Sequence, residues 1–335
     1  MRILLSAQHR YPASGGRSSG FRPRRYPSGS GYHLHDLLAR GLAETGHQVF
    51  YLLSEGWSER PPQGVTPVSQ PVTDVDLLHT IMVPGMHAEA IELMERCGKP
   101  WLTTCHMDRG GARQAGANWI FVSRSLAHAY GRERYVANGI DPRDCCYSAV
   151  KQGYFLFLSA MDKFREKGLD TAVELSKSVG FKLVVAGTAH HRETIDEVRD
   201  YCRAGGAEYV GDVRGKRKAR LMGGARGLLF PSRLNEGCPL VLLEALMSGT
   251  PVISSDTGGC PEIVTSDIGF ICSTDAEYSD AIARIQTIDP ARCRQVALEK
   301  FHYLRMTAGY VREYELEIAA HSRREQILSE GVANA

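Results

Sequence analysis

The sequence has no long apolar run of the kind that crosses a membrane. No window of about 18 consecutive apolar residues occurs, and residues 1–6 are too short an apolar stretch for a signal peptide. The chain also lacks an excess of charge of one sign, because its 40 lysines and arginines nearly balance its 38 aspartates and glutamates. The resulting net charge of +2 gives no strong field that would favour nucleic acid as a partner. These absences favour a soluble, cytoplasmic protein, and they leave a peripheral membrane contact open.

Paired cysteines and clustered metal ligands are missing as well. The nine cysteines are odd in number, and no two of them form a Cys-x-x-Cys pair, which is typical of reduced thiols rather than of a disulfide framework. We find no set of histidine, cysteine and carboxylate residues at the spacing that a metal ion needs. The sequence therefore predicts no metal ion and no required cofactor.

What is present is an alternation of strand and helix patterns. Residues 2–6 have the pattern of a buried strand, residues 32–46 have apolar residues at helical spacing, and residues 47–53 form a second strand pattern. The same order returns at residues 154–159, 169–179 and 182–187. Such units are typical of a doubly wound parallel sheet. A chain of 335 residues has room for about two domains, and we therefore expect an α/β fold with two Rossmann-like domains, over residues 1–148 and 149–309.

The most informative stretch runs from residue 231 to residue 255. A buried-strand pattern at residues 227–231 precedes it, and Pro239 suits the first position of a helix that ends near Ser248. Cys238 is a poor N-cap, which leaves the N–H groups of Leu240 and Val241 available to a phosphate or diphosphate. Two carboxylates lie beside this helix start.

These carboxylates belong to Glu236 and Glu244. Because carboxylates repel phosphate, their expected partners are hydroxyl groups, and a phosphate flanked by hydroxyls describes a sugar nucleotide. The alternative is that this segment binds no ligand and is an ordinary αβ unit with glutamates on its surface.

The whole string P-S-x-x-x-E-G-x-P-L-V-x-x-E-A-x-x-x-G-x-P-V-I-x-S, followed by Gly258 and Gly259, resembles the donor-site signature of the retaining GT-B glycosyltransferases of family 4. The resemblance implies two Rossmann-like domains facing each other across a cleft, with a last helix, about 310–335, that packs back on the first domain. It also implies transfer of a sugar from a nucleotide-diphosphate sugar to a hydroxyl acceptor, with retention. The acceptor would be a small molecule, a glycan or a lipid-linked sugar, in bacterial glycan or natural-product biosynthesis.

The resemblance also assigns roles to residues. Glu244 would bind the ribose hydroxyls of the donor and Glu236 a hydroxyl of its sugar, which His106 would also contact. Lys167 would bind the diphosphate. The expected catalytic residues are Glu236, His106 and Lys167, and the expected donor-binding residues are Glu244, Gly237, Cys238, Leu240, Val241, Lys167, Arg165, Gly29 and Gly31.

Three segments depart from the family pattern or fall outside it. The opening turn reads Gly29-Ser30-Gly31 and follows a long segment, residues 8–31, that is either a lid over the acceptor or a solvated loop. The Gly-Arg pair of the family's phosphate loop reads Ser159-Ala160, and Arg165 or Lys163 is a candidate replacement for the missing guanidinium. The basic run at residues 216–220 is expected to be a solvated face.

Two other classes of function stay open at this stage. One is a different enzyme on the same fold, such as a sugar-nucleotide epimerase or a phosphorylase. The other is a protein that binds a sugar nucleotide without turning it over, which the altered phosphate loop suggests.

Overall fold

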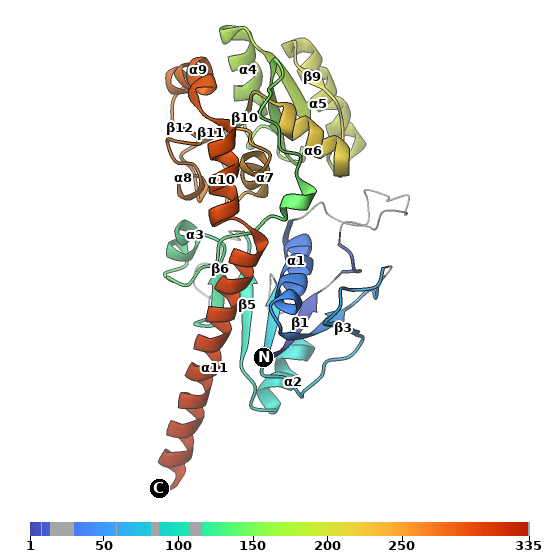
Figure 1. Ribbon diagram of the computed structural model, residues 1–335, viewed down its shortest axis with the longest axis vertical. Helices are drawn as coiled ribbons and strands as arrows, with labels where there is room; N and C mark the ends of the chain where they lie inside the picture. Colours follow the sequence, from blue (N-terminus) through green and yellow to red (C-terminus); the bar gives the residue numbers. More distant parts are fainter. Residues whose placement is uncertain (8, 14–29, 58, 82–86, 108–115, 334–335) are drawn as a thin grey trace. The chain divides into compact units, whose positions relative to one another are not determined.

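The computed structural model describes residues 1–335 except residues 8, 14–29, 58, 82–86, 108–115 and 334–335. The chain forms two compact units (Figure 1). The first comprises Met1–Ala137 and Tyr303–Ala335, and the second comprises Asn138–His302. No helix in the described part of the chain is long and apolar enough to cross a membrane.

The first unit is built on a six-stranded parallel sheet with the strand order β3-β2-β1-β4-β5-β6. Its strands are β1 (Arg2–Ala7), β2 (Gln48–Leu53), β3 (Val65–Val68), β4 (Leu77–Ile81), β5 (Trp101–Cys105) and β6 (Trp119–Phe121). Its helices are α1 (Ser30–Glu44), α2 (Ala88–Arg96), α3 (Arg124–Ala129) and α11 (Tyr303–Ala333). The strand order reverses between β1 and β4, and ligands of such sheets bind beyond the carboxyl ends of the strands at this point.

The second unit repeats this plan in the order β12-β11-β10-β7-β8-β9. Its strands are β7 (Tyr154–Leu158), β8 (Lys182–Ala186), β9 (Glu208–Tyr209), β10 (Gly227–Phe230), β11 (Val252–Ser255) and β12 (Gly269–Cys272). Its α-helices are α4 (Leu169–Val179), α5 (Arg192–Gly205), α6 (Gly215–Gly224), α7 (Leu240–Met247), α8 (Cys260–Ile263), α9 (Asp275–Arg284) and α10 (Pro290–Lys300); two 3₁₀ turns, η2 (Pro142–Asp144) and η3 (Ile285–Thr287), complete it. The predicted α/β class with two Rossmann-like parallel sheets is confirmed. In this sheet the order reverses between β7 and β10.

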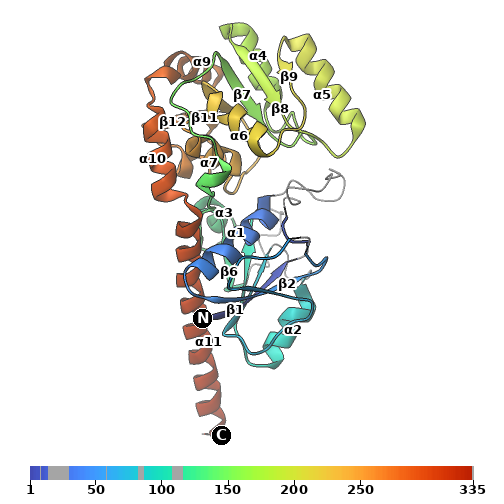
Figure 2. The same ribbon diagram turned by 45° about the vertical axis from the view of Figure 1, so that its right-hand side comes forward.

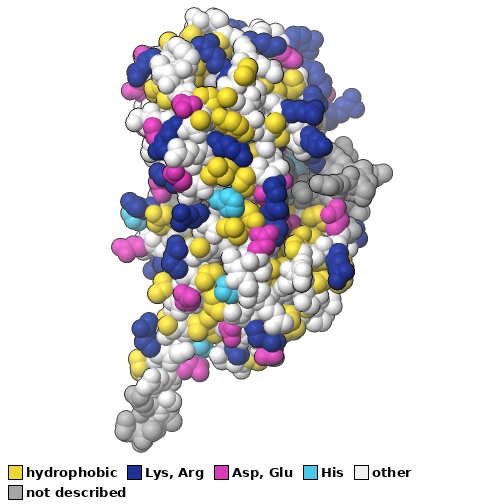
Figure 3. Space-filling model, in the orientation of Figure 1, with side chains coloured by type: hydrophobic (Ala, Val, Ile, Leu, Met, Phe, Trp, Pro, Cys, Tyr) yellow, Lys and Arg dark blue, Asp and Glu magenta, His cyan; other side chains and the backbone are white. Residues whose placement is uncertain are grey.

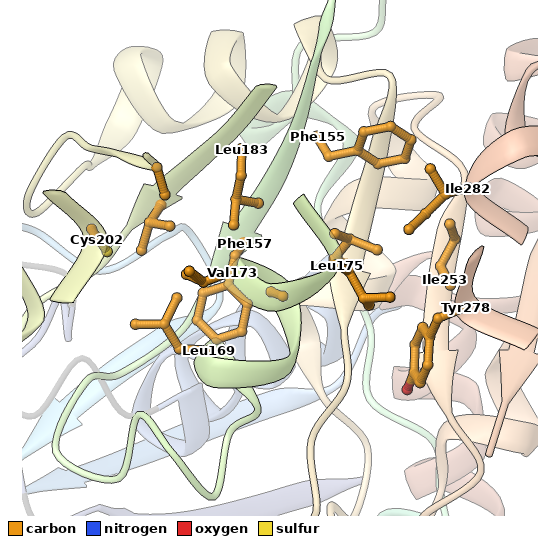
Figure 4. Close-up of a cluster of buried hydrophobic side chains, with 14 of the residues drawn as sticks. Phe155, Phe157, Leu169, Val173, Leu175, Leu183, Cys202, Ile253, Tyr278 and Ile282 are labelled. Carbon is orange, nitrogen blue, oxygen red and sulfur yellow. The ribbon is translucent and has the colours of Figure 1, made fainter. Parts of the chain in front are cut away.

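The core of the second unit lies between its sheet and the helices α4, α5 and α9. Figure 4 shows Phe155 and Phe157 of β7 and Leu183 of β8 among side chains from these helices. All of the labelled residues are at most 5% exposed. Burying a side chain of this size contributes about 2 kcal/mol to the free energy of unfolding. This core therefore holds in place the strands from which the loops of the unit extend.

The last helix, α11, belongs to the first unit by its contacts. It runs for 31 residues beside α1 and β5 (Figures 1 and 2). Arg134 anchors it, because the guanidinium donates to Glu313 and Glu317 at 2.8 Å each. Before it, residues 275–300 form two separate helices, α9 and α10, since Asp289 caps a new helix that begins at Pro290.

The compact units divide at residues 137/138 and 302/303, whereas the boundaries predicted from the sequence are 148/149 and 309/310. A backbone hydrogen bond ties the two ends of the second unit together, close to both divisions. The N–H of Ile140 donates to the carbonyl of Phe301 at 2.7 Å, which joins the first residues of the second unit to its last ones.

Candidate functional site

Two loops meet at the carboxyl edge of the second sheet. Residues 159–168 follow β7, and residues 231–239 follow β10. Because β7 and β10 are adjacent at the point where the strand order reverses, these loops flank the position where doubly wound sheets bind their ligands. Sixty or more residues of chain separate them, so only the sheet order brings them together.

The two loops are joined by an ion pair. The ammonium of Lys167 pairs with the carboxylate of Glu236, and the hydroxyl of Ser232 donates to the same carboxylate at 3.2 Å. The side chains of Lys167 and Glu236 are 21% and 17% exposed, so both are reachable from solvent. Two of the three residues predicted to be catalytic are therefore in contact.

Glycines allow the backbones of this site to approach closely. Gly168 has φ +83°, and a Cβ atom there would overlap the carbonyl oxygen of Pro231. Gly258 has φ +56°, and a Cβ atom there would overlap the backbone of Glu236. In addition, the N–H of Gly259 donates to the carbonyl of Glu236 at 2.7 Å. The Gly258-Gly259 segment, which follows the signature string in the sequence, thus holds the backbone of Glu236 in place.

The helix α7 begins one residue later than expected. Pro239 is the N-cap, with φ −68° and ψ 116°, and Leu240 is the first helical residue, so the prediction that Pro239 is the first helical residue is wrong. The first amides of α7 nevertheless remain available to a phosphate. The Pro239 side chain makes no cap hydrogen bond, and the first N–H groups of a helix have no partner within it. The amides of Leu240 and Val241 thus lie at an uncapped helix start, where the helix dipole favours an anion.

The loop before α7 is held from within the unit. Gly237 and Cys238 are buried, and the side-chain amide of Asn138 donates to the carbonyl of Cys238 at 2.8 Å. Burial raises the pKa of the Cys238 thiol to about 12, so this thiol is neutral beside the helix start. It adds no negative charge that would repel a phosphate.

The second glutamate of the pair has a lysine of its own. The ammonium of Lys218 donates to Glu244 at 2.6 Å, and their side chains are 30% and 22% exposed. The prediction that residues 216–220 form a solvated face is wrong for Lys218, which lies on α6 and turns toward α7. The sequence carries no signal for this pairing. The helices α6 and α7 are separated along the chain by β10, and only their packing brings Lys218 and Glu244 together.

Basic side chains are frequent on this part of the second unit. Figure 3 shows lysine and arginine side chains on the side that carries α5 and α6. The helix α6 contains Lys216, Arg217, Lys218 and Arg220 and no acidic residue. A local excess of positive charge favours an anionic ligand.

An open pocket of about 320 Å³ lies beside Lys167. It is lined by Ala160, Asp162, Lys163, Lys167, His190 and His191. Arg165, one of the donor-binding residues predicted from the sequence, is not in this lining. Its guanidinium donates to Glu197 of α5 at 3.2 Å and lies 5.3 Å from the ring centre of Tyr201.

The first unit brings together two further candidates. Gly31 lies against His106, since a Cβ atom on Gly31 would be 3.5 Å from the imidazole. Burial lowers the pKa of His106 to about 4. The imidazole is therefore neutral at pH 7, and its Nδ1 atom is buried without a hydrogen-bond partner among the described residues. Gly29 lies outside the described residues.

Residues 152–287 match the family model described as Glycosyl transferases group 1. The chain is similar to the O-antigen chain mannosyltransferase B of Escherichia coli, with 28% identity over 159 residues, which are 45% of this chain and 41% of the relative. It is also similar to the sulfoquinovosyl transferase SQD2 of Arabidopsis thaliana, with 27% identity over 130 residues, 36% of this chain and 24% of the relative. The match thus spans less than half the length of either curated relative.

Solved structures resemble the chain over nearly its whole length. AviGT4, a glycosyltransferase involved in avilamycin A biosynthesis, has a TM-score of 0.72 at 22% identity, and the match covers 95% of this chain and 98% of AviGT4. Anabaena HepE in complex with UDP has a TM-score of 0.69 at 14% identity, with 93% and 99% covered. At these identities the likeness shows the shared fold.

Proposed function

We propose that this chain, which has a GT-B fold and matches the group 1 glycosyltransferase family over residues 152–287, transfers a sugar from a nucleotide-diphosphate sugar to a hydroxyl group of an acceptor. The observation that carries the proposal is the geometry around α7. Glu236 and Glu244 each pair with a lysine, and the uncapped start of the helix lies between them in the chain. This arrangement offers acceptors for hydroxyl groups and donors for phosphate within one short segment.

The paired lysines explain how carboxylates and a diphosphate can share this site. A lysine ammonium has three donors, so Lys167 can bond Glu236 and a phosphate oxygen at the same time. The carboxylate of Glu236 then keeps lone pairs for a sugar hydroxyl, and Glu244 does the same for the ribose. In this proposal each glutamate is a hydrogen-bond acceptor for the donor rather than a nucleophile.

The chemical step places negative charge on the departing nucleoside diphosphate. In this proposal Lys167 and the amides of Leu240 and Val241 stabilise this charge, and such preorganised stabilisation is usually the largest contribution to catalysis. The bond between the anomeric carbon and the phosphate oxygen breaks, and the bond to the acceptor oxygen forms. We expect retention of configuration, with the departing phosphate accepting the acceptor's proton, as the family resemblance implies.

The acceptor and the sugar stay open. The two curated relatives are named for different sugars, mannosyl and sulfoquinovosyl, so the resemblance does not select one. We propose that His106 and Gly31 of the first unit contribute to binding the sugar and the donor phosphate. A small molecule, a glycan or a lipid-linked sugar in bacterial glycan or natural-product assembly remains the proposed acceptor class.

A binding titration tests the proposal directly. The purified protein is titrated with UDP, GDP, ADP, CDP and dTDP, with UDP first because HepE was solved with it. We expect one of these diphosphates to bind well above the others. If none binds, the donor site and with it the transferase proposal are refuted.

Substitution of Glu244 tests binding of the donor, and substitution of Lys167 tests turnover. Glu244→Gln is expected to weaken binding of the nucleoside diphosphate by about 10- to 100-fold, because hydrogen bonds to a charged acceptor contribute roughly 1.5–3 kcal/mol each. Lys167→Gln is expected to lower turnover by about 100-fold or more, because it removes charge stabilisation of the leaving group. Isothermal titration calorimetry measures the first effect and an initial-rate assay the second.

Glu299→Gln is the matched control, because Glu299 is an exposed glutamate on α10 of the same unit. It should bind like the unmodified protein. Unchanged affinity in Glu244→Gln would remove the ribose role of that residue.

A further inference from the structure

The pocket beside Lys167 is formed by two neighbouring loops of the second unit. Ala160, Asp162, Lys163 and Lys167 come from the loop after β7, while His190 and His191 come from the loop after β8. The pocket therefore opens at the carboxyl ends of two adjacent parallel strands. Its size, about 320 Å³, suits a small polar group such as a diphosphate.

A hydrogen-bonded turn decides which cations of the first loop face this pocket. The N–H of Lys167 donates to the carbonyl of Lys163 at 2.9 Å, and the N–H of Leu169 donates to Phe164, also at 2.9 Å. These bonds span four and five residues, so the segment winds like a helical turn and residues four apart share one face. Lys163 and Lys167 both line the pocket, whereas Arg165, halfway between them, points to the opposite side.

The other arginines near this loop are already engaged. Arg165 pairs with Glu197, as described above. Arg233 donates to the carbonyl of Arg165 at 2.6 Å, to Asp170 at 3.0 Å and to Thr171 at 2.8 Å. Its guanidinium thus fastens the turn to the loop after β10, and moving it to the pocket would break all three contacts.

The single carboxylate in the pocket lining is held by hydrogen bonds from the second loop. Asp162 accepts from the backbone N–H of His190 and from its imidazole Nδ1, each at 2.9 Å. Burial raises the pKa of the Asp162 carboxyl, but the hydrogen bonds from His190 outweigh burial and hold the pKa below its ordinary value. Asp162 is therefore ionised and tied to the second loop. No ion pair involves Lys163 among the described residues, so its charge stays available.

We propose that Lys163 is the second phosphate-binding cation of the donor site, in the role that an arginine fills where the family has Gly-Arg and this chain has Ser159-Ala160. Lys163 and Lys167 together then bind the diphosphate of the donor from one face of the turn. This inference rests on the proposed function and names a residue that completes its site. A lysine binds as a point charge without the two-pronged geometry of arginine, so recognition depends on the number of phosphate charges.

The test compares nucleotide binding by lysine variants of the full chain. The probe is whichever of UDP, GDP, ADP, CDP and dTDP the unmodified protein binds, together with the monophosphate of the same base. Lys163→Gln is expected to weaken diphosphate binding about 10-fold, the size of one charge-assisted hydrogen bond, and to reduce the preference for diphosphate over monophosphate. Lys163→Arg should restore both, because it returns the charge.

Lys182→Gln is the matched control. Lys182 is an exposed lysine at the first residue of β8, the amino end of the strand, and pairs with Glu208. Equal affinities in Lys163→Gln and Lys182→Gln would overturn the assignment, and so would a larger loss in Arg165→Gln than in Lys163→Gln. Failure of the unmodified protein to bind any diphosphate would instead refute the donor site as a whole, so the two failures are distinguishable.

Discussion

Replacement of Gly168 by alanine is expected to disrupt the site more than any conservative change of a charged residue. Gly168 caps the start of α4 with φ +83°, and a Cβ atom there would overlap the carbonyl oxygen of Pro231. The left-handed conformation of an alanine destabilises the folded state by about 1–2 kcal/mol. Displacing a packed backbone destabilises it by roughly 1–3 kcal/mol more. Because Lys167 is the preceding residue, the same displacement moves its ammonium away from Glu236. We expect the free energy of unfolding to fall by about 3 kcal/mol and diphosphate binding to weaken at least about 10-fold.

The other end of the same helix supplies a matched control. Gly180 caps the end of α4 with φ +79°, and nothing lies within 4 Å of a Cβ atom placed there. Gly180→Ala therefore carries the conformational cost without the collision, about 1 kcal/mol, and should leave diphosphate binding near normal. Urea unfolding followed by circular dichroism measures the stabilities, and calorimetry the binding. Equal losses in the two variants would show that the approach of Gly168 to Pro231 does not matter.

Acidification is expected to unfold the first unit at a pH where the second unit remains folded. The first unit contains a group of histidines with low pKa values: His35 on α1, His79 in β4 and His106 directly after β5. His79 is fully buried and bonds to the hydroxyl groups of Tyr314 at 2.7 Å and Thr104 at 2.8 Å. The imidazole of His35 packs 5.2 Å from that of His79, and its Nε2 atom has no partner among the described residues.

Burial lowers the pKa of each of these groups. It lowers the pKa of His79 to about 3, that of His106 to about 4 and that of His35 well below its ordinary value of 6.5. Below pH 6.5 the unfolded chain therefore binds protons that the folded unit does not, so stability falls with falling pH, down to about pH 3. The stability present above pH 6.5 is lost at roughly 1 kcal/mol per pH unit for each histidine.

The chain carries a selective probe for this measurement. All three tryptophans, Trp57, Trp101 and Trp119, lie in the first unit, so their fluorescence reports the unfolding of that unit alone. We expect the urea midpoint from fluorescence to fall between pH 7 and pH 5 more than the midpoint from circular dichroism. His79→Gln should reduce the pH dependence, whereas His191→Gln, at an exposed position of the second unit, should not change it. A fluorescence midpoint that is the same at both pH values would contradict the prediction.

The fold class and the composition of the donor segment can be predicted from the sequence alone. Buried strands such as β1 and β7 and amphipathic helices such as α4 are local patterns, and their period identifies them without knowledge of the neighbours. The predicted helix over residues 169–179 coincides with α4. Glu236 and Glu244 are recognisable for the same reason, because both lie in one short stretch of chain together with the start of α7.

The partners of these residues depend on tertiary packing. Lys218 meets Glu244 because α6 packs beside α7, and Lys167 meets Glu236 because β7 lies next to β10 in the sheet. The choice between Lys163 and Arg165 likewise depended on the winding of a turn, since both residues have the same charge and nearly the same position in the chain. Local patterns specify which elements form, whereas the orientation of a long charged side chain is set by whatever the folded neighbours offer, and the linear sequence does not record those neighbours.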